Sequence, residues 1–66
     1  MKFKIGDEVK VISGKPDYYN EHRIGDIGFV HHISKEKINL PIHVNFNGSI
    51  CCFKPEQITH TSLNLK

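Results

Sequence analysis

Hydrophobic and polar residues alternate along this chain in short segments, which is the pattern of half-buried β-strands. In "EVKVI", residues 8–12, two valines alternate with longer polar side chains, so Val9 and Val11 are predicted to face inward. The clearest strand is "PIHVNF", residues 41–46, in which every second side chain is apolar. It predicts an inner face of Ile42, Val44 and Phe46 and an outer face of His43 and Asn45.

A hairpin is predicted immediately after this strand. Asn47-Gly48 lies between two alternating segments, and Asn-Gly is the strongest short-range signal for a two-residue type I′ turn. "SICCF", residues 49–53, is therefore the returning strand. Its alternation places Cys51 and Phe53 on the inner face and Ile50 and Cys52 on the outer face.

Another strand is predicted over "GFVHHIS", residues 28–34. Its inward side chains are expected to be Val30 and Ile33, a spacing of three that requires a β-bulge. His31 and His32 are neighbours in this strand, so they are expected on opposite faces of it.

The end of the chain predicts a 3₁₀ turn and a short last strand. Pro55 interrupts "KPEQI", residues 54–58, and Ile58 is expected to return to the core. No segment has a sustained helical period, so we expect one all-β domain over residues 1–66, with its core at about 4–60. Five strands, a long first loop over residues 13–24 and the late 3₁₀ turn fit a small five-stranded SH3-like barrel. Six side chains are predicted to fill its interior: Val9, Val11, Val30, Val44, Phe46 and Phe53.

Composition fits this picture of a small soluble domain. The 66 residues are 38% hydrophobic, and no apolar run approaches the roughly 20 residues that span a bilayer. The first residues reach a charged segment at once and lack a signal peptide, so a cytoplasmic location is expected. The net charge of +2 comes from interleaved signs, which permits a polyanionic partner without requiring one. The two cysteines are adjacent, and reduced thiols are expected.

Several short motifs resemble those of SH3-like electron-transport accessory proteins. The motifs are "GDEVKV", "YYN", the "GxxGxV" of residues 25–30, "NLPIHVNF" and "FKPEQI", and together they cover residues 4–58. The chain resembles the variable chain of ferredoxin–thioredoxin reductase, and it is similar to the small photosystem I subunit that helps to dock ferredoxin. The resemblance implies a non-catalytic subunit that caps or clamps a larger protein or helps a partner to dock. The KOW-type SH3-like barrel, which binds RNA or protein, has a similar glycine pattern.

The two tyrosines of the first loop are the first candidates for a binding site. Tyr18 and Tyr19 are adjacent, so one is expected to pack on the domain while the other faces solvent. The exposed one would join His22 and Arg23 in a recognition patch, because aromatic residues and arginine are enriched where binding energy concentrates.

The outer face of the middle hairpin is the second candidate. Ile50 and Cys52 form an apolar set that a self-contained monomer would not need. We therefore expect a larger protein partner, with a homodimer as the alternative occupant. The predicted partner-binding residues are Tyr18, Tyr19, His22, Arg23, His43, Asn45, Ile50 and Cys52.

A metal site is the less favoured interpretation of the histidines. One histidine of residues 31–32, His43 and Cys52 would approach one another if the three middle strands are neighbours, and imidazole and thiolate are zinc ligands. No zinc-motif spacing is present, and solvated surface histidines are the default. We therefore expect neither a metal nor another cofactor.

Three further functional classes fit the sequence less well. The carboxylates lie mostly in turns without a paired arrangement, and no phosphate-binding glycine loop precedes a helix, so no enzymatic activity is expected. Binding of a polyproline segment needs an aromatic-lined groove, and the chain has no tryptophan. Nucleic-acid binding is the principal alternative, because lysines and a tyrosine can combine phosphate contacts with base stacking.

Overall fold

The computed structural model describes residues 2–36 and 38–61. In this part of the chain there are five short strands, three 3₁₀ turns and no α-helix. The strands are β1 (Glu8–Val11), β2 (Ile27–Ile33), β3 (Ile42–Phe46), β4 (Ser49–Phe53) and β5 (Ile58–His60). The turns are η1 (Pro16–Tyr18), η2 (Glu21–Arg23) and η3 (Pro55–Gln57). The predicted all-β class, the five strands and the 3₁₀ turn before the last strand are confirmed.

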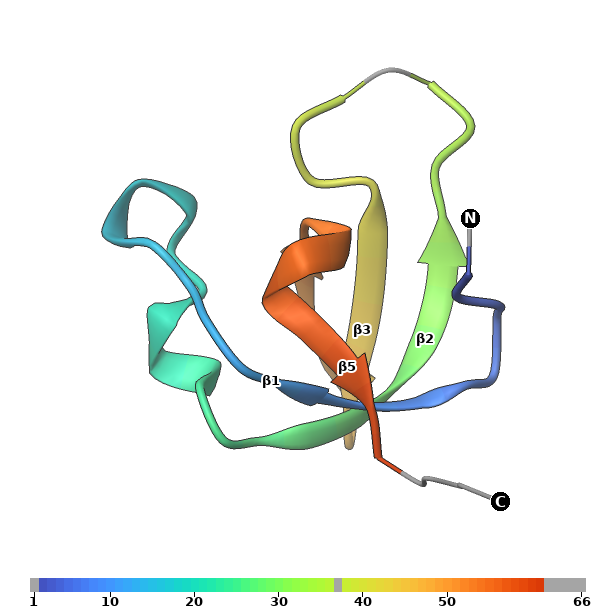
Figure 1. Ribbon diagram of the computed structural model, residues 1–66, viewed down its shortest axis with the longest axis horizontal. Coiled ribbons are helices and arrows are strands. Elements are labelled where there is room, and N and C mark those ends of the chain that lie inside the picture. Colours follow the sequence, from blue (N-terminus) through green and yellow to red (C-terminus); the bar gives the residue numbers. More distant parts are fainter. Residues whose placement is uncertain (1, 37, 62–66) are drawn as a thin grey trace.

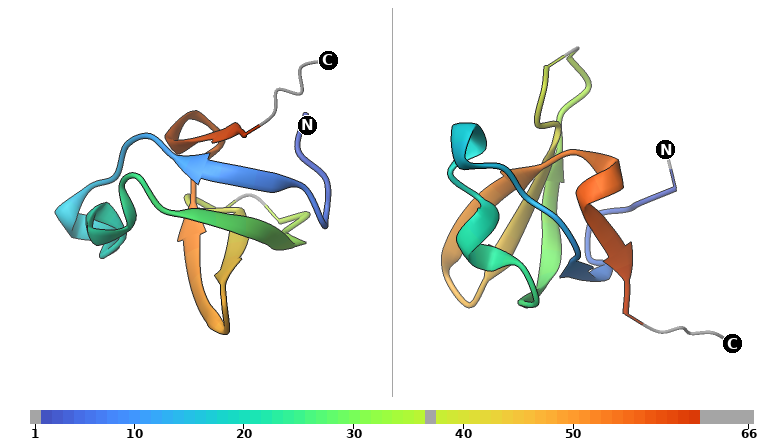
Figure 2. Two further views of the ribbon diagram at one scale, coloured as in Figure 1. Left: turned by 90° about the horizontal axis from the view of Figure 1, so that it is seen from below. Right: turned by 60° about the vertical axis from the view of Figure 1, so that its left-hand side comes forward.

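The strands form one antiparallel sheet in the order β4-β3-β2-β1-β5. Figure 1 shows that the sheet is strongly bent, because β2 begins alongside β1 and curves upward until it lies alongside β3. Figure 2 shows the same bend from below, with the hairpin of β3 and β4 projecting away from β1. Among the described residues no ladder joins β4 to β5, so hydrogen-bonded closure into a barrel is not found.

The inner face of the bent sheet carries one hydrophobic core. Its buried members are Phe3, Val9, Val11, Val30, Ile42, Val44, Phe46, Phe53 and Ile58. All six side chains that were predicted to fill the interior belong to it, and so does Ile58. Burial of each contributes about 1.5–3 kcal/mol, so this set supplies most of the energy that favours folding. Phe3, which precedes the first strand, is an addition that the alternation did not predict.

The predicted β-bulge lies in β2. The pairing of β2 with β3 shifts register between Val30 and His32, so Val30 pairs with Val44 and His32 pairs with His43. Val30 is buried, and Ile33 packs against the core, as the spacing of three requires. The expectation that His31 and His32 lie on opposite faces is wrong, because the bulge interrupts the alternation and leaves both side chains exposed.

The hairpin between β3 and β4 has the predicted turn. Asn47 and Gly48 both have positive φ angles, 59° and 102°, as a type I′ turn requires. The side-chain oxygen of Asn45 accepts a hydrogen bond from the backbone N–H of Gly48 at 2.6 Å. Local hydrogen bonding therefore fixes the register that pairs Phe46 with Ser49.

A buried polar network attaches the first loop to the rest of the domain. Asn20 is only 1% exposed, and its amide nitrogen donates to the carbonyl of Cys52 at 2.9 Å and to the side-chain oxygen of Gln57 at 3.2 Å. Its amide oxygen accepts from the backbone N–H of Lys15 at 3.0 Å. The side-chain oxygen of Gln57 also accepts from the backbone N–H of Lys54 at 2.9 Å. The network therefore joins the first loop, the end of β4 and η3.

The segment before β1 is held against β5 by a carboxylate. The Oδ2 atom of Asp7 accepts from the backbone N–H of Lys4 at 2.9 Å and lies 2.8 Å from Nε2 of His60. The ring of Phe3 packs 4.7 Å from the His60 ring, centroid to centroid. The hydrogen bond with His60, followed by that from Lys4, lowers the pKa of Asp7 below its ordinary value.

Candidate functional site

The two tyrosines of the first loop face different surroundings. Tyr18 is half-buried, and the ammonium group of Lys54 lies 5.3 Å from its ring centroid. Tyr19 is 83% exposed and has a left-handed backbone, with φ 56°. The predicted pairing of one anchored and one exposed tyrosine is confirmed. Its cause is different from the expected one, because the chain leaves η1 through a left-handed residue instead of running extended.

An open pocket lies on the outer side of the first loop. It has a volume of about 470 Å³ and is lined by Pro16, Tyr19, Glu21 and His22. The structure therefore brings together two of the predicted site residues, Tyr19 and His22. Proline and tyrosine supply the apolar surface of this first-loop pocket, and a carboxylate and an imidazole stand beside it.

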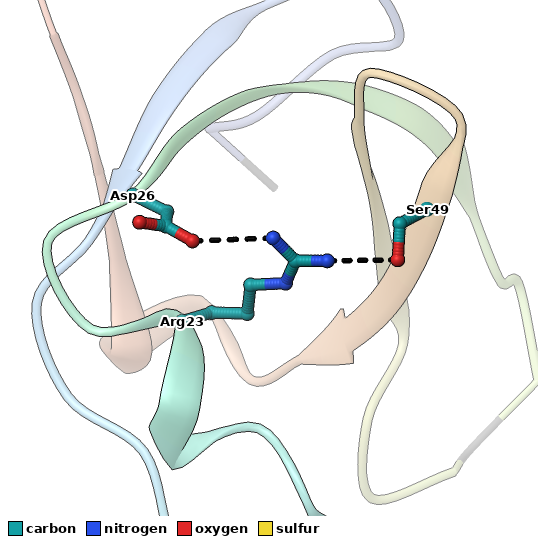
Figure 3. A network of polar contacts seen from close by, with 3 residues as sticks. All are labelled: Arg23, Asp26 and Ser49. Atoms are coloured by element: carbon teal, nitrogen blue, oxygen red, sulfur yellow. Dashed lines mark hydrogen bonds and ion pairs between the residues drawn. The ribbon is translucent and has the colours of Figure 1, made fainter.

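Arg23 does not line this pocket, and it links the first loop to the middle hairpin. Figure 3 shows its guanidinium between Asp26 and Ser49, with Nη1 3.2 Å from the Asp26 carboxylate and Nη2 donating to the Ser49 hydroxyl at 2.7 Å. The same group lies 4.5 Å from the centroid of the Phe46 ring, a cation–π distance. Cys51 and then Asp26 raise the pKa of Arg23 above its ordinary value, so the group is always cationic. The positive charge of Arg23 therefore interacts with groups of the domain itself, namely Asp26 and the Phe46 ring.

The outer face of the sheet carries a row of residues in direct cross-strand register. Phe29 of β2 pairs with Asn45 of β3, which pairs with Ile50 of β4. Phe29 is 53% exposed and Ile50 is 48% exposed, whereas Asn45 is half-buried between them. We name Phe29, Asn45 and Ile50 the sheet row. Ile27 is 54% exposed two residues before Phe29 in the same strand, so it extends the apolar surface.

Phe29 and Ile27 are the site residues that the sequence analysis missed. The signal was present, because an inward Val30 and a close-packed Gly28 place Phe29 and Ile27 outward by alternation. A Cβ atom at Gly28 would lie 2.7 Å from the carbonyl oxygen of Asn45, so β2 approaches β3 closely at the residue that precedes Phe29.

A second row lies beside the first on the outer face. His32 pairs with His43, and His43 pairs with Cys52. The ring centroids of His32 and His43 are 5.3 Å apart, with the rings nearly perpendicular. Of the predicted approach of one histidine of residues 31–32, His43 and Cys52, the contact between the two histidines is confirmed, and the first of them is His32. A three-member group that includes Cys52 is not found among the described residues. Burial, followed by the neighbouring Cys51, raises the pKa of the Cys52 thiol.

Larger clusters of chemically active groups are lacking in the part of the chain that the structure describes. There, no group of three or more histidine, cysteine, aspartate and glutamate side chains is placed to hold a metal ion. Both cysteines are half-buried free thiols. No helix of the described residues has the length and hydropathy needed to cross a bilayer.

The predicted site residues thus separate into three groups. Tyr19 and His22 line the first-loop pocket, and Asn45 and Ile50 belong to the sheet row. The remaining four make contacts within the domain or lie in the second row, which consists of His32, His43 and Cys52. Those four are Tyr18, Arg23, His43 and Cys52. No model of a known protein family matches the chain, and no curated protein matches its sequence.

Proposed function

We propose that this chain is a non-catalytic SH3-like module that binds a larger protein through the outer face of its sheet. The observation that carries the proposal is the sheet row, where Phe29 and Ile50 remain about half exposed on either side of Asn45. Neighbouring strands are about 4.8 Å apart, so the backbones at Phe29 and Ile50 are about 10 Å apart, with Asn45 between them. Exposed apolar side chains gathered on one face mark sites of protein interaction.

The outer face has an apolar centre and a charged edge, as small protein interfaces do. An aromatic anchor, Phe29, is accompanied by two aliphatic side chains, Ile27 and Ile50. Across β1, the charged side chains of Glu8 and Lys10 stand opposite Phe29 and Ile27 and form a polar edge. Interfaces have an apolar centre and a polar rim, and a few aromatic residues carry most of their binding energy. Covering the exposed half of each apolar side chain is worth about 1 kcal/mol.

The family resemblance supports the same function. Five antiparallel strands, a long first loop and a 3₁₀ turn before the last strand are the features on which the expectation of an SH3-like fold is based. The resemblance to the variable chain of ferredoxin–thioredoxin reductase favours a subunit that attaches to a larger protein. The first-loop pocket, which Tyr19 lines, offers a second contact surface.

Two contacts favour a protein partner over nucleic acid. The guanidinium of Arg23 is engaged by Asp26 and Ser49, and the ammonium of Lys54 lies over the ring of Tyr18. These contacts occupy two of the cations and one of the aromatic rings that phosphate and base contacts would use. Glu8 also stands directly beside Phe29 in the sheet.

The test is loss of partner binding upon substitution of the sheet row. The full chain serves as bait, and a partner retained by the wild type is purified and its affinity measured. Phe29→Ser and Ile50→Ser should each weaken binding about fivefold, which is what about 1 kcal/mol corresponds to, and Tyr19→Ser should weaken it less. The matched control is Ile38→Ser, since Ile38 is 46% exposed and lies in the loop between β2 and β3.

Salt dependence separates the two classes of partner. Binding to an apolar face should change little between low and moderate salt, whereas binding to mixed RNA or DNA should fall steeply with the number of phosphate contacts. Wild-type affinity in Phe29→Ser and Ile50→Ser, or a steep salt dependence with nucleic acid as the retained ligand, would reject the proposal.

A further inference from the structure

His32 and His43 form a cross-strand pair of imidazoles on the outer face of the sheet. They occupy directly opposed positions of β2 and β3, immediately beyond the bulge. The His32 side chain is exposed and that of His43 is half-buried, so solvent reaches the pair. Both backbones are fixed by the ladder between two strands, which holds the rings near each other without any ligand.

The spacing of the rings fits chelation. The Zn–N bond to histidine is about 2.0–2.1 Å, and a ligating nitrogen lies about 1.2 Å from its ring centroid, so each centroid would stand about 3.2 Å from a shared ion. For two such ligands at a tetrahedral angle, the centroids are about 5.2 Å apart. The observed separation is 5.3 Å. The ring planes are nearly perpendicular, and coordination of two imidazoles to one ion sets no condition on the angle between their planes.

We propose that His32 and His43 together bind a divalent transition-metal ion such as Zn²⁺ or Ni²⁺. Imidazole nitrogen is a preferred ligand for these ions. Each ring contributes one nitrogen, and water fills the other coordination positions. The inference does not rest on the proposed docking function, although the pair lies on the same face of the sheet as the sheet row.

The ligand set is limited to these two side chains. Cys52 follows His43 in the same row, but its side chain is half-buried, whereas that of His32 is exposed. Among the described residues no third histidine, cysteine or carboxylate completes a cluster with the pair. A two-imidazole site accordingly binds more weakly than a closed structural zinc site, which has four protein ligands.

Calorimetric titration of the chelator-treated full chain with ZnCl₂ and with NiCl₂ tests the site. We expect one ion per chain and an increase in the melting temperature. At a free metal concentration of ten times Kd, the ratio of folded to unfolded protein increases about elevenfold. His32→Asn and His43→Asn should each weaken binding at least tenfold.

Two matched variants distinguish this site from general binding to histidine. His31→Asn removes the exposed neighbour that has no cross-strand imidazole, and Cys52→Ser removes the next residue of the row; both should bind within threefold of the wild type. In the folded wild type, zinc should shift the ring resonances of His32 and His43 in NMR spectra more than those of His31. The proposal is rejected if binding is absent at millimolar metal, if both pair variants bind like the wild type, or if the largest NMR shifts fall on other histidines.

Discussion

The inner and outer faces of β2, β3 and β4 belong to the same strands but differ in how deeply their apolar side chains are buried. On the inner face, Val44 and Phe53 are fully buried, at 0% exposure. On the outer face, Phe29 and Ile50 are equally apolar but about half exposed. Folding accounts for the first pair, because a chain of this size needs every buried side chain. The second pair contributes little to folding, which is why it is the better candidate for binding.

The largest expected effect separates the two faces by stability. Phe53→Ala empties a fully buried site and should cost about 3–5 kcal/mol, a large part of the 5–15 kcal/mol typical of a domain. Phe29→Ala should change the free energy of unfolding by less than about 1 kcal/mol, because its ring is already half in water. Urea denaturation followed by circular dichroism measures both changes.

A milder substitution keeps this test informative if Phe53→Ala does not fold. Phe53→Leu retains most of the buried volume and should still cost more than Phe29→Leu. Equal losses for the two positions would contradict the distinction between the faces and would make Phe29 a structural residue.

The next effect concerns a polar side chain in the interior. Asn20→Ala removes hydrogen bonds to Cys52, Gln57 and Lys15 and should cost about 1–3 kcal/mol, because buried polar groups then lose their partners. The amide of Lys15 should also exchange its hydrogen faster, which native-state hydrogen exchange measures. Asn39→Ala is the control, since Asn39 is exposed. An unchanged exchange rate at Lys15 would show that the first loop is held by other contacts.

The strands could be predicted from the sequence because alternation reports burial directly. Val9, Val44 and Phe46 each stand between polar neighbours, and Asn47-Gly48 fixes the register of the hairpin. The bulge followed in the same way from the spacing of Val30 and Ile33. Each of these features is local in sequence, so no knowledge of the tertiary structure was needed.

The candidate site could be predicted only in part because it depends on register between strands. Phe29 meets Asn45 and Ile50 through two ladders, and the positions at which they pair are not encoded in any one segment. Arg23 was expected in an exposed patch, but it contacts Asp26 and Ser49, the latter 26 residues away in sequence. Long-range polar contacts of this kind leave no periodic signal.

The smallest expected effect tests whether an exposed polar contact also contributes to stability. The side chains of Asp7 and His60 are 28% and 39% exposed, so their interaction is screened by solvent and worth about 1 kcal/mol or less. The pKa of Asp7 is lowered in the folded state, which means that its carboxylate stabilises the fold only while it is ionised. This contribution is complete above the unfolded pKa, near 4, and is lost as the pH falls through the folded pKa.

Comparison with Asp7→Asn isolates that contribution from the other carboxylates. The wild type should be the more stable protein at pH 6, and the difference between the two free energies of unfolding should shrink as the pH decreases below about 4. Asp17→Asn is the control, because Asp17 is exposed in η1 and has no side-chain bond among the described contacts. If the advantage of the wild type over Asp7→Asn persisted unchanged to pH 2, the carboxylate of Asp7 would have no part in it. The packing of the Phe3 ring on the His60 ring would then be the contact that holds the segment before β1 against β5.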